Sequence, residues 1–261
     1  SDKISESDPF ADGVYVLKVK PVEDLCSDQE EEEKALATSR ALNEYLLKAH
    51  GILENLGFPA NFLLSKWAGR ARSIPSFKEK WGLRGVVLAQ TPLFRGLARY
   101  VGMDFIQISS LAEGIRLLPQ LEYDFIHLHT KATDDAAHTK NPENKVKAIE
   151  EIDSLLGEMV LNQGDLLIIT GDHSTPSVGT LIHSGDTVPI LFFGPNVRVD
   201  EVKEFDEISC SQGHLRLEGK DLLPVILNHL DRALLYGLRL GERITPYIPC
   251  YGELEPLLPE D

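Results

Sequence analysis

The chain has 261 residues, 43% of them hydrophobic, which is enough for one large domain or two smaller ones with an apolar core. Its formal net charge of −15 argues against nucleic acid or an anionic membrane surface as a partner. No run of about 18 apolar residues is present, and the first ten residues lack the basic and apolar regions of a signal peptide.

The first quarter of the chain is predicted to hold one long helix between two short strands. Residues 14–18 alternate in polarity and indicate a strand. A helix is expected from Ser27, whose side chain can cap it, and the acidic run that follows suits the positive end of a helix. This helix should end near Gly57, and residues 60–64 are predicted to form a second short strand.

A basic stretch follows in an otherwise acidic chain. It contains Lys66, Arg70, Arg72, Lys78, Lys80 and Arg84. Glu79 is its only acidic residue. Two interpretations stand side by side: a mixed surface loop, or a lid that binds phosphate or carboxylate groups, for which guanidinium groups are well suited.

From residue 85 onward, short apolar segments alternate with helical ones. Strands are expected at 85–89, 104–108, 124–129, 165–170 and 188–193. Helices are expected at 92–101, 111–120, 141–162 and 219–235, and the proline-rich tail from Arg243 should be irregular. This alternation predicts an α/β fold with a mostly parallel sheet covered by helices on both faces. In such sheets, ligands bind beyond the carboxyl ends of the strands.

Metal-type ligands follow the expected strand 124–129. Asp134 and His138 are four residues apart, so on one helical turn they face the same side and can share an ion. Asp135 competes with Asp134 for this role. His127 and His129 lie at alternate positions of the strand and are expected to pack behind the ligands.

A second set follows the expected strand 165–170. Asp172 and His173 come directly after Gly171, and His183 lies in the loop before the next strand. A single Asp-His pair is more often a capped turn than a metal site. Such residues at successive strand ends, however, favour a metal site, and mixed carboxylate and imidazole ligands suit Mn²⁺, Zn²⁺, Co²⁺ or Fe²⁺ better than Mg²⁺ alone.

Five motifs together resemble those of the archaeal-type cofactor-independent phosphoglycerate mutases, of the alkaline phosphatase superfamily. They are ISESDP at 4–9, PSFKEKWGLRG at 75–85, KATDDAAH at 131–138, KVKAIEEID at 145–153, and GDHSTP at 171–176 with His183 and Ser184. The resemblance extends over nearly the whole chain. It implies an enzyme that interconverts 3-phosphoglycerate and 2-phosphoglycerate through a phosphoserine.

The resemblance implies two divalent metal ions, with Mn²⁺ expected and Zn²⁺, Co²⁺ or Mg²⁺ as alternatives. One ion would be held by Asp134, His138 and His183. The other would be held by Asp172 and His173, together with an aspartate and the nucleophilic serine from the N-terminal part of the family's chain.

The resemblance also assigns the substrate site and the domains. Lys80 would take part in catalysis, and the substrate would be bound by Asp8, Lys66, Arg70, Arg72 and Arg84. Residues 1–72 would form part of a lid domain, 73–240 a metal-binding phosphatase-like domain, and 241–261 a C-terminal tail.

The chain departs from the family pattern near its start. It has no early strand ending in Asp-Gly and no upstream serine motif, and Phe10 stands where the family has a histidine. We therefore expect a C-terminal portion of a longer enzyme, which acts together with the missing N-terminal segment. The alternatives are a phosphatase or another phosphomutase on the same site, and a non-catalytic fragment or partner subunit.

The number and spacing of the cysteines indicate the cellular compartment of the protein. Cys26, Cys210 and Cys250 are odd in number, far apart and without a CxxC pair. They indicate reduced thiols, and hence a cytoplasmic protein.

Overall fold

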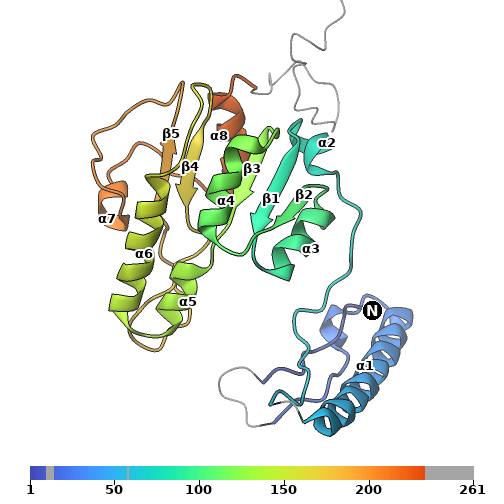
Figure 1. Ribbon diagram of the computed structural model, residues 1–261. Helices are drawn as coiled ribbons and strands as arrows, with labels where there is room; N and C mark the ends of the chain where they lie inside the picture. Colours follow the sequence, from blue (N-terminus) through green and yellow to red (C-terminus); the bar gives the residue numbers. More distant parts are fainter. Residues whose placement is uncertain (10–14, 58, 233–261) are drawn as a thin grey trace, which may run out of the picture. The chain divides into compact units, whose positions relative to one another are not determined.

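Figure 1 shows the computed structural model of the protein, which describes residues 1–9, 15–57 and 59–232. The chain divides into two compact units, residues 1–73 and 74–261, and each is described by itself. The predicted tail at 241–261 lies outside the described residues. The roles predicted for the lid and the phosphatase-like domain remain predictions.

The first unit is built around one long helix, α1 (Gln29–Leu56). The sequence predicted this helix but placed its cap one residue early. Asp28 is the cap and accepts a 2.8 Å hydrogen bond from the backbone N–H of Glu31. The carboxylate of Glu31 in turn accepts a 2.9 Å hydrogen bond from the N–H of Ser27. The helix ends at Gly57, whose φ of 67° is a left-handed conformation that glycine adopts readily.

The prediction of two short strands in this unit was wrong. Residues 15–18 and 60–64 form no regular strand; residue 14 lies outside the described residues. The segment 17–22 instead runs antiparallel to residues 3–7 through isolated hydrogen bonds and one bridge between Ile4 and Pro21. An alternating pattern forms a strand only where a neighbouring strand continues the hydrogen-bond ladder, and here the contact is too irregular.

The second unit contains the parallel sheet that the sequence predicted, and the α/β fold class is confirmed. Its strands are β1 (Gly85–Ala89), β2 (Asp104–Gln107) and β3 (Phe125–Leu128), in the order β2-β1-β3. All five residues of β1 are buried. A central strand that is apolar throughout matches a sheet covered on both faces.

Alternate residues of β1 build the two halves of the core. On one face, Val86 and Leu88 pack with Ile108, and Leu117 of α4 (Leu111–Leu117) packs against this cluster. On the other face, Val87 and Ala89 pack with Ala98 of α3 (Pro92–Tyr100). This two-residue alternation is that of a strand, so β1 fixes the helices on both sides of the sheet.

The last two strands form a separate pair. β4 (Leu167–Thr170) and β5 (Ile190–Phe193) are antiparallel, with Leu167 opposite Phe193. The expectation of one mostly parallel sheet is therefore wrong for these two strands. The chain between them, residues 171–189, contains no helix, and a parallel return requires a long crossover, usually helical.

The remaining helices complete the second unit. They are α2 (Phe77–Trp81), η3 (Leu118–Gln120), α5 (Ala132–His138), α6 (Pro142–Leu156), α7 (Glu207–Cys210), η4 (Gly219–Asp221) and α8 (Leu222–His229), while the first unit adds η2 (Glu23–Leu25). The sequence did not predict α2 or α7. The helix expected at 141–162 ends early, at Leu156, and the one expected at 219–235 ends at His229. None of the helices in the described ranges is both long and apolar enough to span a membrane.

Candidate metal centre

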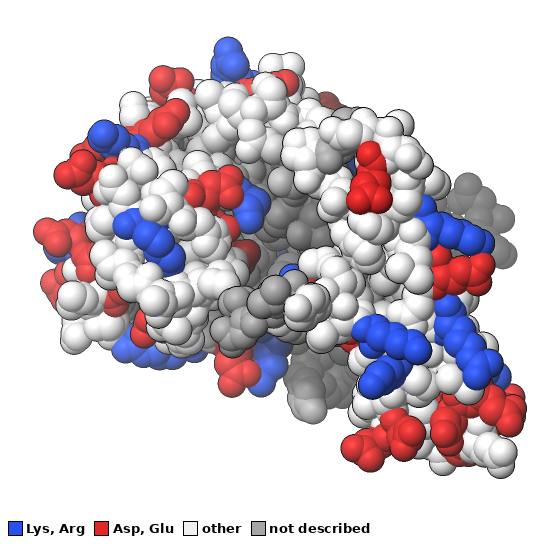
Figure 2. Space-filling model, turned by 90° about the horizontal axis from the view of Figure 1, so that it is seen from below, with Lys and Arg blue, Asp and Glu red and all other residues white. Residues whose placement is uncertain are grey.

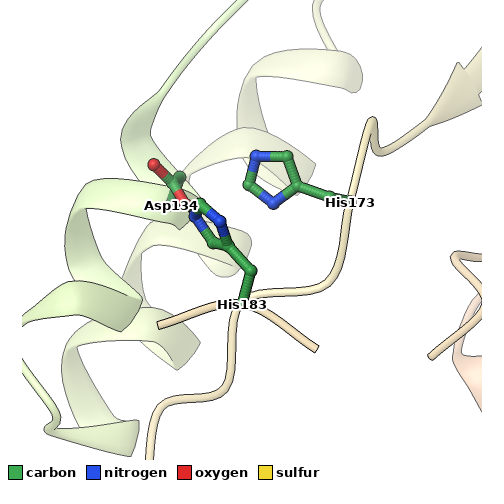
Figure 3. Close-up of side chains that lie close together, drawn as sticks. All are labelled: Asp134, His173 and His183. Atoms are coloured by element: carbon green, nitrogen blue, oxygen red, sulfur yellow. Dashed lines mark ion pairs between the residues drawn. The ribbon is translucent and has the colours of Figure 1, made fainter. Parts of the chain in front are cut away.

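Ligand-type side chains from two separate segments meet at the carboxyl end of β3. Figure 3 shows Asp134 on α5 converging with His173 and His183, which lie on the loop between β4 and β5. One ligand atom from each of the three residues lies within 4.8 Å of the other two. The Oδ1 atom of Asp134 is 3.3 Å from Nε2 of His138, one helical turn later, and 3.7 Å from Nε2 of His183.

The carboxylate of Asp134 is held in its charged form. Its side chain is only 15% exposed, and this desolvation by itself raises the pKa. Hydrogen bonds from Lys131 Nζ to Oδ2 (2.8 Å) and from Thr175 Oγ1 to Oδ1 (2.7 Å) act in the opposite direction and prevail, so the pKa is lowered to about 2. Asp134 is therefore an anionic ligand group at neutral pH.

The two histidines of the loop are brought together by the backbone. The N–H of Ser184 donates a 3.0 Å hydrogen bond to the carbonyl of Ser174, and the two residues form an isolated antiparallel bridge. As a result, the ring centroids of His173 and His183 lie 4.2 Å apart. Asp172 joins from the outside, with Oδ2 3.5 Å from Nε2 of His173.

This donor set fits a divalent ion. Ligand atoms about 2.0–2.2 Å from one ion lie within about 4.4 Å of each other, and the ligand atoms of the three residues, within 4.8 Å of one another, approach this spacing. The resemblance implied two ligand sets, Asp134 with His138 and His183, and Asp172 with His173. The structure places the two sets against each other, because His173 lies beside both Asp134 and His183.

The structure separates Asp134 from Asp135, which the sequence left open. Asp134 faces the histidines, whereas Asp135 is exposed on α5 and is not a member of the cluster. Sequence reasoning missed Lys131 and Thr175, which both contact Asp134. Both lie within the KATDDAAH and GDHSTP motifs, so a signal was present, although their residue types are not those of metal ligands.

Lys80 and Arg84 are not brought to this cluster. Lys80 lies on α2, with Nζ 4.9 Å from the ring centroid of Trp81. Arg84 lies just before β1, and its carbonyl accepts hydrogen bonds from the N–H groups at the start of β3. Both residues are thus at the amino edge of the parallel sheet, whereas Asp134 follows the carboxyl end of β3 (Figure 1). Their predicted roles with substrate remain predictions.

The other predicted substrate-binding residues belong to the first unit. Lys66 forms an ion pair with Asp8 (3.3 Å), and Arg70 forms one with Asp2 (2.9 Å). Arg72 lies in the same unit. On the face seen in Figure 2, basic side chains are interspersed with acidic ones. The pairing of Lys66 with Asp8 joins two of the predicted residues, and their role in binding substrate remains a prediction.

Comparison with known proteins adds relatives of named function. A sequence profile described as the metalloenzyme superfamily matches residues 35–229. A "2,3-bisphosphoglycerate-independent phosphoglycerate mutase 2" of Methanocaldococcus jannaschii is 60% identical over 267 residues, which cover 98% of this chain and 62% of that protein. A mutase of Picrophilus torridus is 35% identical and covers 91% of this chain and 62% of its own length. The chain thus spans about three fifths of these relatives.

Two solved structures resemble the fold. The PH0037 protein from Pyrococcus horikoshii matches with a TM-score of 0.68 and 31% identity, covering 78% of this chain and 60% of that one. The cofactor-independent phosphoglycerate mutase from Thermoplasma acidophilum matches with a TM-score of 0.55 and 27% identity, covering 88% and 59%. Together with the superfamily match and the cluster around Asp134, these relatives support the use of a divalent metal.

Proposed function

The chain belongs to the metalloenzyme superfamily, and from this premise we propose that it is the metal-binding part of a cofactor-independent phosphoglycerate mutase. Its activity would be the interconversion of 3-phosphoglycerate and 2-phosphoglycerate. The named relatives support the reaction. Because the chain spans 62% of the M. jannaschii protein, the activity belongs to the proposal for the whole enzyme.

One observation carries this proposal. Asp134, His173 and His183 come from a helix and a loop that are separated in sequence, yet their ligand atoms lie within 4.8 Å of one another. They do so at the carboxyl end of β3, where parallel α/β sheets bind their ligands. Phosphoryl-transfer enzymes commonly use such metal sites to neutralise charge on the phosphoryl oxygens.

We propose that the site holds two ions. The ligand chemistry supports a divalent metal, and the number of ions is part of the proposal. Asp134, His138 and His183 would hold one, and Asp172 and His173 would provide part of the second. The close approach of His173 to His183 suits two neighbouring ions. Mn²⁺ is the proposed metal, with Zn²⁺, Co²⁺ and Mg²⁺ as alternatives, because the donor set mixes carboxylate and imidazole.

In the proposed reaction, a serine outside this chain takes the phosphoryl group from one hydroxyl of glycerate and returns it to the neighbouring hydroxyl. When bound, a divalent ion supplies charge neutralisation at the phosphoryl oxygens and favours the deprotonated nucleophile. The residues of this chain hold the ions in place. Lys131 adds a fixed positive charge beside Asp134, at the edge where the anionic substrate would arrive.

The basic residues and the location are part of the same proposal. Asp8, Lys66, Arg70 and Arg72 would act from a lid formed by the first unit. Lys80 and Arg84 would reach the substrate only if they approach the carboxyl edge, which their positions on α2 and before β1 do not support. We also propose a cytoplasmic location, which the free thiols of Cys26 and Cys210 within the described part of the chain support.

The experiment is to measure metal binding and turnover together. The purified chain is titrated with Mn²⁺, and 2-phosphoglycerate formation from 3-phosphoglycerate is followed without added bisphosphoglycerate, with the chain alone and with the segment that the longer relatives possess. Metal binding by the chain, and mutase activity once the segment is added, would support the proposal. Absence of metal binding would refute the metal site, and absence of activity in the complemented enzyme would refute the reaction.

A phosphatase acting at the same site is the second candidate. The position of Lys80 and Arg84 at the amino edge favours it, because a mutase must retain the glycerate during the transfer and these two cations are not at the cluster. In the complemented assay, release of free phosphate from several phosphomonoesters, without conversion between the two phosphoglycerates, would identify this activity.

A further inference from the structure

Thr175 is the polar residue that connects the two halves of the metal cluster. It lies two positions after His173 and is only 4% exposed. Its Oγ1 atom is 2.7 Å from Oδ1 of Asp134 and 3.2 Å from Nδ1 of His173. A buried hydroxyl thus lies between a carboxylate on α5 and an imidazole on the loop after β4.

The hydrogen bonds of Thr175 favour the tautomer of His173 that carries its proton on Nδ1. A hydroxyl has one proton to donate, and Asp134 is anionic, so the proton points to the carboxylate. The contact with His173 is then satisfied only if Nδ1 of the imidazole donates to Oγ1. The lone pair of Nε2 is then directed toward Asp172 Oδ2, 3.5 Å away, where an ion shared by the two side chains would lie.

The backbone around Thr175 is fixed from α6. The ammonium group of Lys145 donates a 2.8 Å hydrogen bond to the carbonyl of Thr175. Lys140, just before α6, donates to the carbonyls of Pro176 (2.9 Å) and Leu181 (2.6 Å). These charge-assisted bonds hold the loop on both sides of its turn, so the hydroxyl of Thr175 has a defined position.

We propose that Thr175 is a positioning residue for the metal site: it joins Asp134 to His173 and presents Nε2 of His173 for coordination, with Lys145 fixing its backbone. The inference rests on the proposed metal site. Groups that orient metal ligands in this way commonly change metal affinity by about 10–100-fold when they are removed. Neither residue touches the ion in this assignment, and both act through the ligands.

Two substitutions at Thr175 separate the hydroxyl from the shape of the side chain. Thr175→Val keeps the branched shape and removes the hydroxyl, whereas Thr175→Ser keeps the hydroxyl. Thr180→Val is the matched control, because Thr180 is exposed on the same loop. Mn²⁺ and Zn²⁺ affinities are measured by competition with a chelating dye. We expect Thr175→Val to lose about 10–100-fold in affinity, and both Thr175→Ser and Thr180→Val to stay within about threefold of the parent.

The second measurement does not need metal or activity. Nitrogen chemical shifts of the His173 ring in the metal-free parent protein report its tautomer. The Nδ1–H tautomer is expected in the parent and in Thr175→Ser, and a mixture of tautomers in Thr175→Val. An Nε2–H tautomer in the parent would overturn the inference, even if Thr175→Val failed to fold.

Lys145 offers an independent variant. Lys145→Met removes the hydrogen bond to the carbonyl of Thr175, and Lys147→Met, at an exposed position of the same helix, is its control. A loss of metal affinity in Lys145→Met alone would support the inference. Tight metal binding by the parent together with unchanged binding by Thr175→Val would overturn it and leave the proposed function standing. If the parent binds no metal, both fail.

Discussion

The ammonium group of Lys131 donates a 2.8 Å hydrogen bond to Oδ2 of Asp134, while Oδ1 of the same carboxylate faces the histidines. The two oxygens therefore have different surroundings. One is paired with a cation of the protein itself, and the other is directed at the cluster. This division favours coordination through Oδ1, and it explains why the pKa of a largely buried aspartate is lowered.

Replacing Lys131 should change the pKa of Asp134 in a defined direction. Lys131→Met removes both the hydrogen bond and the nearby positive charge, so the pKa of Asp134 should rise from about 2 toward its ordinary value. Carbon chemical shifts of the carboxyl group, followed between pH 6 and pH 2 in metal-free protein, measure the change. Lys147→Met should leave the titration as it is. An unchanged pKa in Lys131→Met would show that the ion pair is not formed in solution.

Removing a ligand should weaken metal binding more than any change on the surface. Asp134→Asn and His183→Ala each remove one donor of the cluster, and each is expected to lower Mn²⁺ affinity by more than about tenfold, the lower limit for residues that only orient ligands. The control is His214→Ala, at a position outside the cluster. Calorimetric titration gives the affinities and the number of ions. Equal affinities in all three variants would contradict the ligand assignment.

The stability of the metal-free protein should depend on pH through His129. The ring of His129 packs against the ring of Phe94, with centroids 3.8 Å apart and a tilt of 33° between the ring planes. Desolvation, reinforced by the neighbouring His127, lowers its pKa below about 6.5, the ordinary value for histidine. The unfolded chain then binds the proton more readily than the folded one. The contribution of His129 to stability is therefore complete above about pH 6.5 and is lost as the pH falls through its folded-state pKa.

Urea unfolding with a chelator present, at several pH values between 8 and 5, tests this dependence. His129→Gln should have a shallower loss of stability than the parent as the pH falls, whereas His214→Gln should follow the parent. Identical pH profiles for the parent and His129→Gln would show that the desolvation of this ring has no effect on stability.

The central strand should be far more sensitive to truncation than the surface. Leu88 is fully buried in β1, so Leu88→Ala should lower the free energy of unfolding by about 2–5 kcal/mol, from lost burial and the cavity left behind. Leu93 on α3 is 76% exposed, and Leu93→Ala should cost less than about 0.5 kcal/mol. Thermal or urea unfolding compares the two. A small effect of Leu88→Ala would contradict the core described here.

Local sequence patterns predicted the elements whose environment is uniform along their length. The run at 85–89 is apolar at every position, and it forms β1 with the predicted bounds. The strand predicted at 14–18 is absent over its described residues, 15–18, because an alternating pattern does not by itself supply a neighbouring strand, and the strand predicted at 60–64 did not form either. The helix at 77–81 was missed, because its signal is a single capping box between Ser76 and Glu79 inside a stretch that was interpreted by its charge.

The sequence by itself determined the α/β class and the candidate metal ligands, because hydrophobic periodicity and ligand chemistry are properties of short segments. Only the tertiary structure decided how these residues are grouped. Asp134 and His173 are 39 positions apart, and their connection through Thr175 depends on how α5, α6 and the loop after β4 pack. The tertiary structure also decided that Lys80 and Arg84 lie at the amino edge of the sheet and Asp134 at the carboxyl edge. These positions depend on how distant segments pack together.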